Sequence, residues 1–253
     1  MKLRIERSVV VITPTVARPS LTQAIQSVTN QTYKNLIHLI VIDGPEYFEE
    51  ALKLIAINKQ SNSNIVFTTA PFNTGGDGFY GHRIYAGYSH LVNQDYVAFL
   101  DEDNWFEPNH IQSLVEELEK NDYSWVHSLR KVYVNDDYLA DDCCESIGRW
   151  PIWFSPEDAP QHLVDTSSYL FERDFLSKVA NHWHWGWGGD RRFYTIITKG
   201  MGVENNYGTT GLHTLNYRLP DMNKAYGGDF KFFEKGNAAI LQKYNGVYPW
   251  KKI

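Results

Sequence analysis

Cysteine is scarce in this sequence of 253 residues, which contains only Cys143 and Cys144. Adjacent cysteines rarely form a disulfide with each other, and two thiols are too few for a structural zinc site. We therefore expect two free thiols in a reducing compartment. The length is sufficient for a sizeable hydrophobic core, so the fold does not need covalent cross-links.

Long apolar runs are also missing, since none approaches the ~18 residues of a transmembrane helix. The charged residues 1–7 precede a short apolar run and lack the hydrophobic region and cleavage site of a signal peptide. We therefore expect a cytoplasmic protein without a transmembrane segment. An excess of basic residues is lacking too. The formal net charge of -6 argues against nucleic acid as a general partner, although it leaves room for a local basic site.

The first half of the sequence contains short apolar runs that alternate with amphipathic stretches. The runs are rich in β-branched residues and predict buried strands at residues 8–13, 36–42, 65–69 and 97–100. Apolar residues at helical spacing predict helices between them. This alternation is typical of an α/β fold with a mostly parallel sheet and helices on both faces.

The pattern after residue 105 is shorter and more aromatic. We expect a helix from Pro108, strands at 124–134 and 166–173, a loop or flap at 136–150, and a short helix capped by Asp174. Repeats, low-complexity runs and linkers are missing. The sequence therefore predicts one domain over residues 1–253, with a nucleotide-binding half at 1–104 and a mixed, aromatic-rich half at 105–253.

The stretch "YVAFLDEDNWFEPNHI" brings three carboxylates directly after a buried strand, with no lysine or arginine beside them. Asp101, Glu102 and Asp103 either form a solvated turn or hold a hard cation such as Mg²⁺ or Mn²⁺. Asp43 and the Thr13–Thr15 segment also stand where predicted strands end. Each alone is explained by a turn or a cap, but ligands bind at the carboxyl ends of parallel strands, so their coincidence favours a site.

Two segments resemble the glycosyltransferases of the GT-A fold, most closely the broad family-2 group. They are "VVVITPTVARPSLTQAIQSVTNQTYKNLIHLIVIDG" and "DYVAFLDEDNWFEPNHI", and with the stretch between them they cover about the first half of the chain. The second segment is similar to the Asp-x-Asp motif of that group. The resemblance implies that Asp103 holds Mn²⁺ or Mg²⁺ directly and that Asp101 reaches the ribose, or the metal through water.

The same resemblance assigns further residues to the nucleotide-sugar donor. Those expected to contact the nucleotide, sugar or phosphate are Thr13, Pro14, Thr15, Arg18, Asp43, Asp77, Arg83, Asp101 and Glu102. For Asp77 and Arg83, a surface loop and a charge at a helix start are equally good explanations. A downstream histidine is commonly the third metal ligand in this fold. His213 is the candidate, and its alternative is a loop histidine without a ligand.

The segment "WHWGWGGDRRF" is similar to the Trp-Gly-Trp-Gly-Gly-Glu-Asp motif of the inverting β-1,4-galactosyltransferases, but it has one acid instead of two. The similarity implies that Asp190 is the catalytic base, the alternative being a helix N-cap. It also implies that an acceptor or sugar is lined by Trp185, Trp187, Gly188 and Gly189.

Together these segments predict a metal-dependent inverting glycosyltransferase, a hexosyl- or pentosyltransferase. It would move a sugar from a nucleotide diphosphate sugar, with UDP favoured, to a hydroxyl of a glycan or another acceptor. One alternative is a sugar nucleotidyltransferase, which usually has a Gly-rich basic segment after its first strand; here that position reads "PTVARPS". Another is a non-catalytic carbohydrate-binding protein of the same fold.

Overall fold

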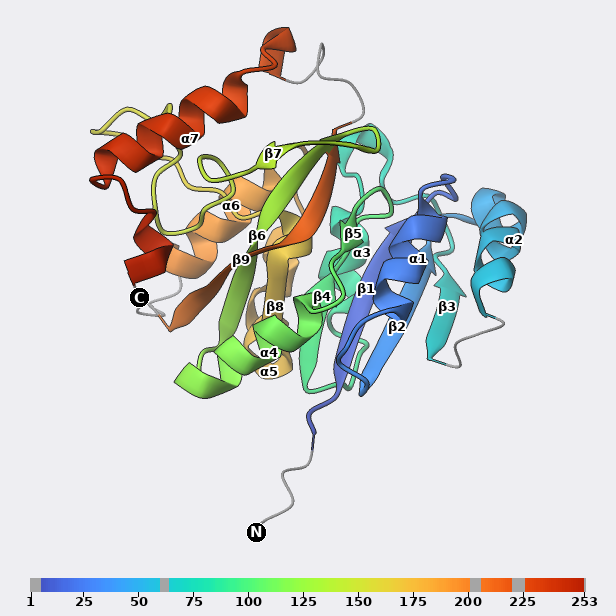
Figure 1. The fold of residues 1–253 in the computed structure, drawn as a ribbon. Coiled ribbons are helices and arrows are strands. Elements are labelled where there is room, and N and C mark those ends of the chain that lie inside the picture. The colour runs from blue at the N-terminus through green and yellow to red at the C-terminus, as the bar shows by residue number, and fades with distance from the viewer. Residues whose placement is uncertain (1–5, 60–63, 201–205, 220–225, 253) are drawn as a thin grey trace.

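The computed structural model describes residues 6–59, 64–200, 206–219 and 226–252. A single sheet runs through this part of the chain in the order β3-β2-β1-β4-β8-β6-β9-β5, and β7 pairs with β6 beside it (Figure 1). The strands are β1 (Val9–Thr15), β2 (Leu36–Ile42), β3 (Ile65–Thr69), β4 (Tyr96–Phe99), β5 (Trp105–Phe106), β6 (Trp125–Val134), β7 (Asp137–Asp141), β8 (Tyr169–Glu172) and β9 (Tyr207–Leu219).

The helices are α1 (Leu21–Thr29), α2 (Phe48–Lys59), α3 (His82–Tyr88), α4 (His110–Asn121), α5 (Arg173–Val179), α6 (Gly189–Thr195) and α7 (Phe232–Lys243). Short 3-10 turns lie at Pro45–Tyr47, Gly76–Gly78, Thr166–Ser168, Ala180–Trp183, Tyr226–Gly228 and Pro249–Lys252, and α6 continues into one π-helical segment, Ile196–Gly200. None of the helices in the described part of the chain has the length and apolarity that crossing a membrane requires.

The two faces of β1 belong to different layers of the core. Val9 and Val11 pack on one face with apolar residues of α1 and α4. Val10 and Ile12 pack on the other face with residues of α3, α5 and α6. Successive side chains of a strand point to opposite faces, so an uninterrupted apolar run marks a strand covered on both sides. The predicted helices on both faces are confirmed.

The first half of the sheet is parallel, as the alternation of strands and helices predicts. β1 pairs in parallel with both β2 and β4, and β2 pairs in parallel with β3. Antiparallel pairing begins where β8 joins β4 and continues to β6. The carboxyl ends of β1, β2 and β4 therefore meet on one edge, while the second half of the chain extends the same sheet sideways.

Two local predictions are wrong. The expected loop at 136–150 contains β7, because Asn135 adopts a left-handed conformation (φ 56°) and turns the chain back into a hairpin with β6. None of the β7 residues is buried, and the aspartates at both of its ends hide the alternation that marks a strand. The cap of α5 is Glu172 rather than Asp174, which lies in the first turn of that helix. The prediction of free thiols is confirmed, since both cysteines are unpaired and buried.

Candidate functional site

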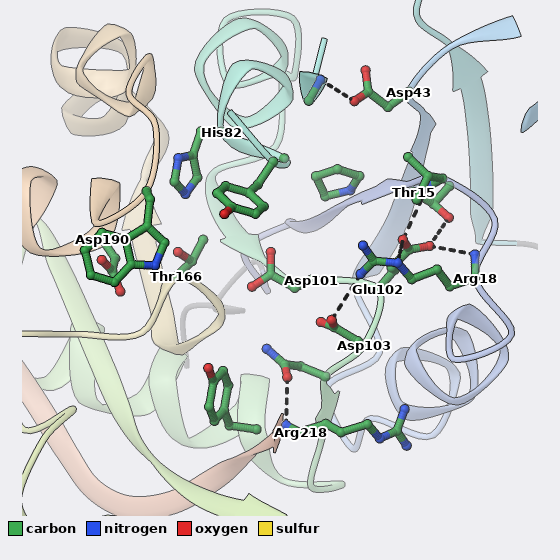
Figure 2. A pocket seen from close by; sticks show the side chains of 18 of the residues that line it. Thr15, Arg18, Asp43, His82, Asp101, Glu102, Asp103, Thr166, Asp190 and Arg218 are labelled. Carbon is green, nitrogen blue, oxygen red and sulfur yellow. Dashed lines mark hydrogen bonds and ion pairs between the residues drawn. The ribbon is translucent and has the colours of Figure 1, made fainter. Parts of the chain in front are cut away.

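A cleft of about 680 Å³ opens at the carboxyl ends of β1, β2 and β4. Its walls come from both halves of the chain, and Figure 2 shows Asp43, Asp101 and Asp190 facing it from three separate segments. The predicted site residues that line it are Pro14, Thr15, Arg18, Asp43, Asp101, Glu102, Asp103, Trp187, Gly188 and Asp190.

Asp101 and Asp103 bring a concentration of negative charge into the middle of this cleft. The pKa of Asp101 is raised to about 7, first by burial and then by the neighbouring charges of Asp103 and Asp165, while hydrogen bonds from two hydroxyls oppose the shift. Burial also raises the pKa of Asp103, although the charge of Arg18 opposes this shift. The Arg18 guanidinium lies 3.3 Å from the Asp103 carboxylate. Both acids are therefore costly to ionise without a further positive charge.

These two carboxylates are the residues of the cleft that could hold a divalent cation. Within residues 6–59, 64–200, 206–219 and 226–252, no group of three or more histidine, cysteine, aspartate or glutamate side chains has the arrangement of a metal site. A cation bound by Asp101 and Asp103 would thus take its other ligands from a substrate or water. Mg²⁺ is usually bound in this way, by one or two carboxylates and substrate phosphates.

Glu102 lines the cleft, as expected of a residue that contacts the donor, and it also makes hydrogen bonds within the protein. Its buried carboxylate accepts hydrogen bonds from the Thr15 hydroxyl at 2.5 Å and from the backbone amides of Val16 and Arg18 at 3.3 and 3.1 Å. These contacts fasten the turn after β1 to the turn after β4. Glu102 therefore has its acceptor capacity committed to the protein, and the structure gives it a positioning role in the cleft wall.

Asp43 likewise holds a loop in place. Its Oδ1 accepts from the amide and hydroxyl of Thr74, and its Oδ2 accepts from the Gly75 amide at 2.8 Å. This draws the loop at 71–81 over the end of β2. A Cβ at Gly75 would lie 2.4 Å from the Tyr80 carbonyl oxygen, so only glycine fits that crossing.

Several residues predicted to contact the donor do not line the cleft. Thr13 is fully buried, and its hydroxyl lies 2.9 Å from His38 Nε2 of β2. Asp77 is exposed on the glycine-rich loop in a left-handed conformation. Arg83 stacks over the Phe79 ring, 3.4 Å from its centroid, and donates to the Thr74 carbonyl. Arg83 therefore contacts two residues of the loop at 71–81 and stabilises its conformation.

The structure does not bring His213 to the two acids. Its Nε2 lies 3.4 Å from the Cys143 sulfur, and burial lowers its pKa. Trp185 is covered by the Arg192 guanidinium, 4.0 Å from the ring centroid, and lies outside the cleft lining. Gly189 is buried against His82, where a Cβ would lie 2.7 Å from the imidazole.

Asp190 does line the cleft, and it is not an N-cap. Gly188 occupies the cap position of α6 with φ 76°, and Asp190 lies in the first turn. Burial raises the pKa of Asp190, while a 2.8 Å hydrogen bond from the Arg191 amide and the Arg191 charge oppose the shift. Trp187 stands beside it at the rim and is 79% exposed. Asp190 is thus a carboxylate available to a ligand in the cleft.

A buried charge cluster at this end of the cleft was not predicted. Arg130 of β6 donates to Asp142 at 2.8 Å, Glu145 at 2.6 Å and Asp165 at 2.8 Å, and none of the four is more than 5% exposed. The guanidinium also lies over the ring of Tyr217, 4.2 Å from its centroid. The run of acids at 141–145 is the one local signal that could have indicated this cluster. Other lining residues missed from the sequence include His82, Thr166, Arg218 and Tyr226.

Comparison with known proteins agrees with this architecture. Residues 8–143, more than half of the chain, match the family model described as Glycosyl transferase family 2. No curated protein sequence matches significantly. The S. aureus TarS fragment 1–349 in complex with UDP superposes with a TM-score of 0.60 at 13% identity, over 84% of this chain and 60% of that fragment. The same fragment in complex with UDP-GlcNAc superposes with a TM-score of 0.59 at 14% identity, over 92% of this chain and 66% of that fragment.

A structure of S. aureus TarS gives a TM-score of 0.56 at 11% identity and covers 96% of this chain. The chain spans 44% of that protein and about three fifths of the UDP-bound fragment. At such identities the likeness concerns the fold alone, and it confirms the expected GT-A architecture. The family model covers the strands that carry Asp43, Asp101 and Asp103, and on this ground the chain belongs to glycosyl transferase family 2.

Proposed function

We propose that this protein is a metal-dependent, inverting glycosyltransferase that moves a sugar from a UDP-sugar to a hydroxyl of a glycan or similar acceptor. One observation carries the proposal: a single cleft has Asp101 and Asp103 in its middle and Asp190 at one end, on separate segments (Figure 2). Asp101 and Asp103 suit the binding of a diphosphate with its cation, and Asp190 suits the removal of a proton from an acceptor hydroxyl. The TarS fragments bound to UDP and UDP-GlcNAc support the choice of nucleotide.

The donor would lie along the edge formed by β1, β2 and β4. Pro14, Tyr47 and Asn73 line the part of the cleft near Asp43, and the glycines of the loop at 71–81 let backbone approach a ligand closely. Arg18 and Arg218 line the same cleft and could meet phosphate oxygens, because planar guanidinium groups bind such oxygens in pairs. In this arrangement the diphosphate would lie next to Asp101 and Asp103.

A divalent cation fits the oxygen ligands that Asp101 and Asp103 offer, and both would hold it. When bound, it would offset the charge that develops on the departing diphosphate. The protein's own part is to present two closely spaced carboxylates whose ionisation burial makes costly. Mn²⁺ and Mg²⁺ both suit such ligands.

Asp190 would act as the general base. Its carboxylate accepts the proton of the acceptor hydroxyl while that oxygen forms a bond to the anomeric carbon of the donor. The bond between this carbon and the diphosphate oxygen breaks, and its electron pair leaves with the diphosphate. A single displacement of this kind inverts the anomeric carbon and needs no covalent enzyme intermediate.

The test is calorimetric titration of UDP into the wild type with and without Mn²⁺, and into Asp103→Ala. We expect metal-dependent binding by the wild type that the substitution abolishes. Asp174→Ala is the matched control, because Asp174 lies on α5 with 83% of its side chain exposed. GDP and dTDP follow if UDP does not bind. Failure of all three nucleotides would reject the enzyme proposal in favour of a non-catalytic carbohydrate-binding protein.

The stereochemical part of the proposal needs a product rather than a binding constant. UDP-sugars are screened for transfer or hydrolysis, and the anomeric configuration of the first-formed product is read by NMR. An inverted centre is the expected result, and a retained centre would rule out single displacement assisted by Asp190.

A further inference from the structure

The Asp101 carboxylate is held by two hydroxyl groups, one on each oxygen. The Tyr85 hydroxyl donates to Oδ1 at 2.7 Å, and the Ser167 hydroxyl donates to Oδ2 at 3.2 Å. Both of these side chains are completely buried. Neither residue lines the cleft, and Asp101 is the lining residue to which both hydroxyls donate; the Ser167 oxygen also accepts from Asn104 of the lining at 3.4 Å.

The direction of the hydrogen bonds around Ser167 follows from its neighbours. Its oxygen accepts from the Asp101 amide at 3.0 Å, and an amide can only donate. The hydroxyl proton is therefore free to point at Oδ2 of the carboxylate. The Ser167 amide in turn donates to Asp165 at 2.9 Å, and Asp165 is bound by Arg130. Ser167 is thus fixed by the buried charge cluster behind it.

Tyr85 is fixed by packing instead. It lies in α3, and its ring meets Phe99 of β4 with centroids 4.4 Å apart and Trp183 with centroids 6.0 Å apart. A ring enclosed in this way holds its hydroxyl in one place. The Tyr85 hydroxyl is thus held by aromatic packing and the Ser167 hydroxyl by the buried ion pairs. Together they prevent the Asp101 carboxylate from rotating about χ2.

We propose that Tyr85 and Ser167 are positioning residues for the nucleotide and its cation, holding the Asp101 carboxylate in the orientation that receives them. This inference rests on the proposed function. Each Asp101 oxygen uses one lone pair on a buried donor, and the remaining lone pairs belong to the cleft that Asp101 lines. Loss of a group that orients a metal ligand typically costs about 10–100-fold in metal affinity or activity.

The test compares Tyr85→Phe with the wild type by titration of UDP with and without Mn²⁺. The substitution removes one hydroxyl and keeps the ring in its packing. We expect roughly a 10-fold loss of UDP affinity in the presence of Mn²⁺ and no change in its absence. Tyr33→Phe is the matched control, because the Tyr33 hydroxyl donates to the Arg7 carbonyl, outside the cleft lining. This control should match the wild type in both titrations.

Wild-type affinity of Tyr85→Phe with Mn²⁺ would overturn the inference. An equal loss with and without the metal would also overturn it, because that result indicates a general role in folding. If the wild type itself shows no metal-dependent UDP binding, the proposed function fails first. Circular dichroism checks that the variant is folded. If it is not, Ser167→Ala is tested with the same titrations and the same expected result.

Discussion

The Thr15 hydroxyl donates to the buried Glu102 carboxylate across 2.5 Å, and this bond joins the end of β1 to the acid turn after β4. Glu102→Gln would replace one acceptor oxygen by a donor that faces amide donors. We expect a loss of about 1.5–3 kcal/mol in the free energy of unfolding, measured by urea denaturation. Glu116→Gln, at an exposed position of α4, should change it by less than about 0.5 kcal/mol. Equal stability of the two variants would mean that Glu102 does not hold the turn.

Replacement of Asp190 should separate catalysis from nucleotide binding. Asp190→Asn keeps the shape of the side chain but cannot accept a proton at neutral pH, so kcat should fall by about 10²–10⁴. UDP affinity with Mn²⁺ should stay within about 3-fold, because the base acts on the acceptor. Turnover is measured as UDP release from the donor identified by screening, with Asp174→Asn as the control. A parallel loss of kcat and UDP affinity would argue that Asp190 serves binding instead.

The pH dependence of turnover should reflect the raised pKa of Asp190. A base must be deprotonated, so kcat should be low below the pKa of Asp190 and should rise as the pH increases through it. Because this pKa is raised, the rise should occur at a pH above the ordinary aspartate range. Arg191 opposes the shift, and Arg191→Gln should therefore move the acid limb to higher pH. The neighbouring Arg192→Gln is the control, since Arg192 stacks on Trp185. An acid limb that does not move in Arg191→Gln would assign it to another group.

Three buried histidines should make the fold sensitive to mild acid. Burial lowers the pKa of His38 and His110 to about 3 and that of His127 to about 4. These side chains are neutral in the fold, while the unfolded chain binds protons below about pH 6.5. The unfolded chain therefore gains protons that the folded chain does not as the pH falls from about 6.5 towards 4. Over this range the free energy of unfolding should fall by about 1.4 kcal/mol per pH unit for each histidine, and above it the histidines should have no such effect.

Urea denaturation at several pH values between 7 and 4.5 measures this slope. His38→Gln should remove about one histidine's share of it, whatever its effect on stability at pH 7. His90→Gln, at an exposed position, should leave the slope unchanged. A His38→Gln slope equal to that of the wild type would show that His38 is not a neutral histidine in the fold.

The parallel half of the fold was predictable because its strands are covered on both faces and read as apolar runs. The position of Asp43, Asp101 and Asp103 followed from the same rule, since parallel strands end on one edge. Thr13 does not line the cleft because it lies two residues before the end of β1, where its hydroxyl contacts His38.

His213 could not be placed from sequence because sheet register decides where it points. β9 runs parallel to β6 with register shifts around Leu129, its partner. A shift of one residue turns a side chain to the other face of a sheet. The Arg130 cluster was hidden for a related reason, as its partners lie 12, 15 and 35 residues away and form no local pattern.

Arg130 and its three carboxylates also limit how this end of the cleft can change between relatives or by engineering. Loss of one partner would strand a charge in the interior, which typically costs 3–5 kcal/mol. We therefore expect the four residues of this cluster to be kept or replaced together, both in relatives and in engineered variants. The mostly exposed stretch at 154–161 lies between Glu145 and Asp165 in the sequence and carries none of these buried charges. It is the natural place to diversify the protein without disturbing the charges beneath.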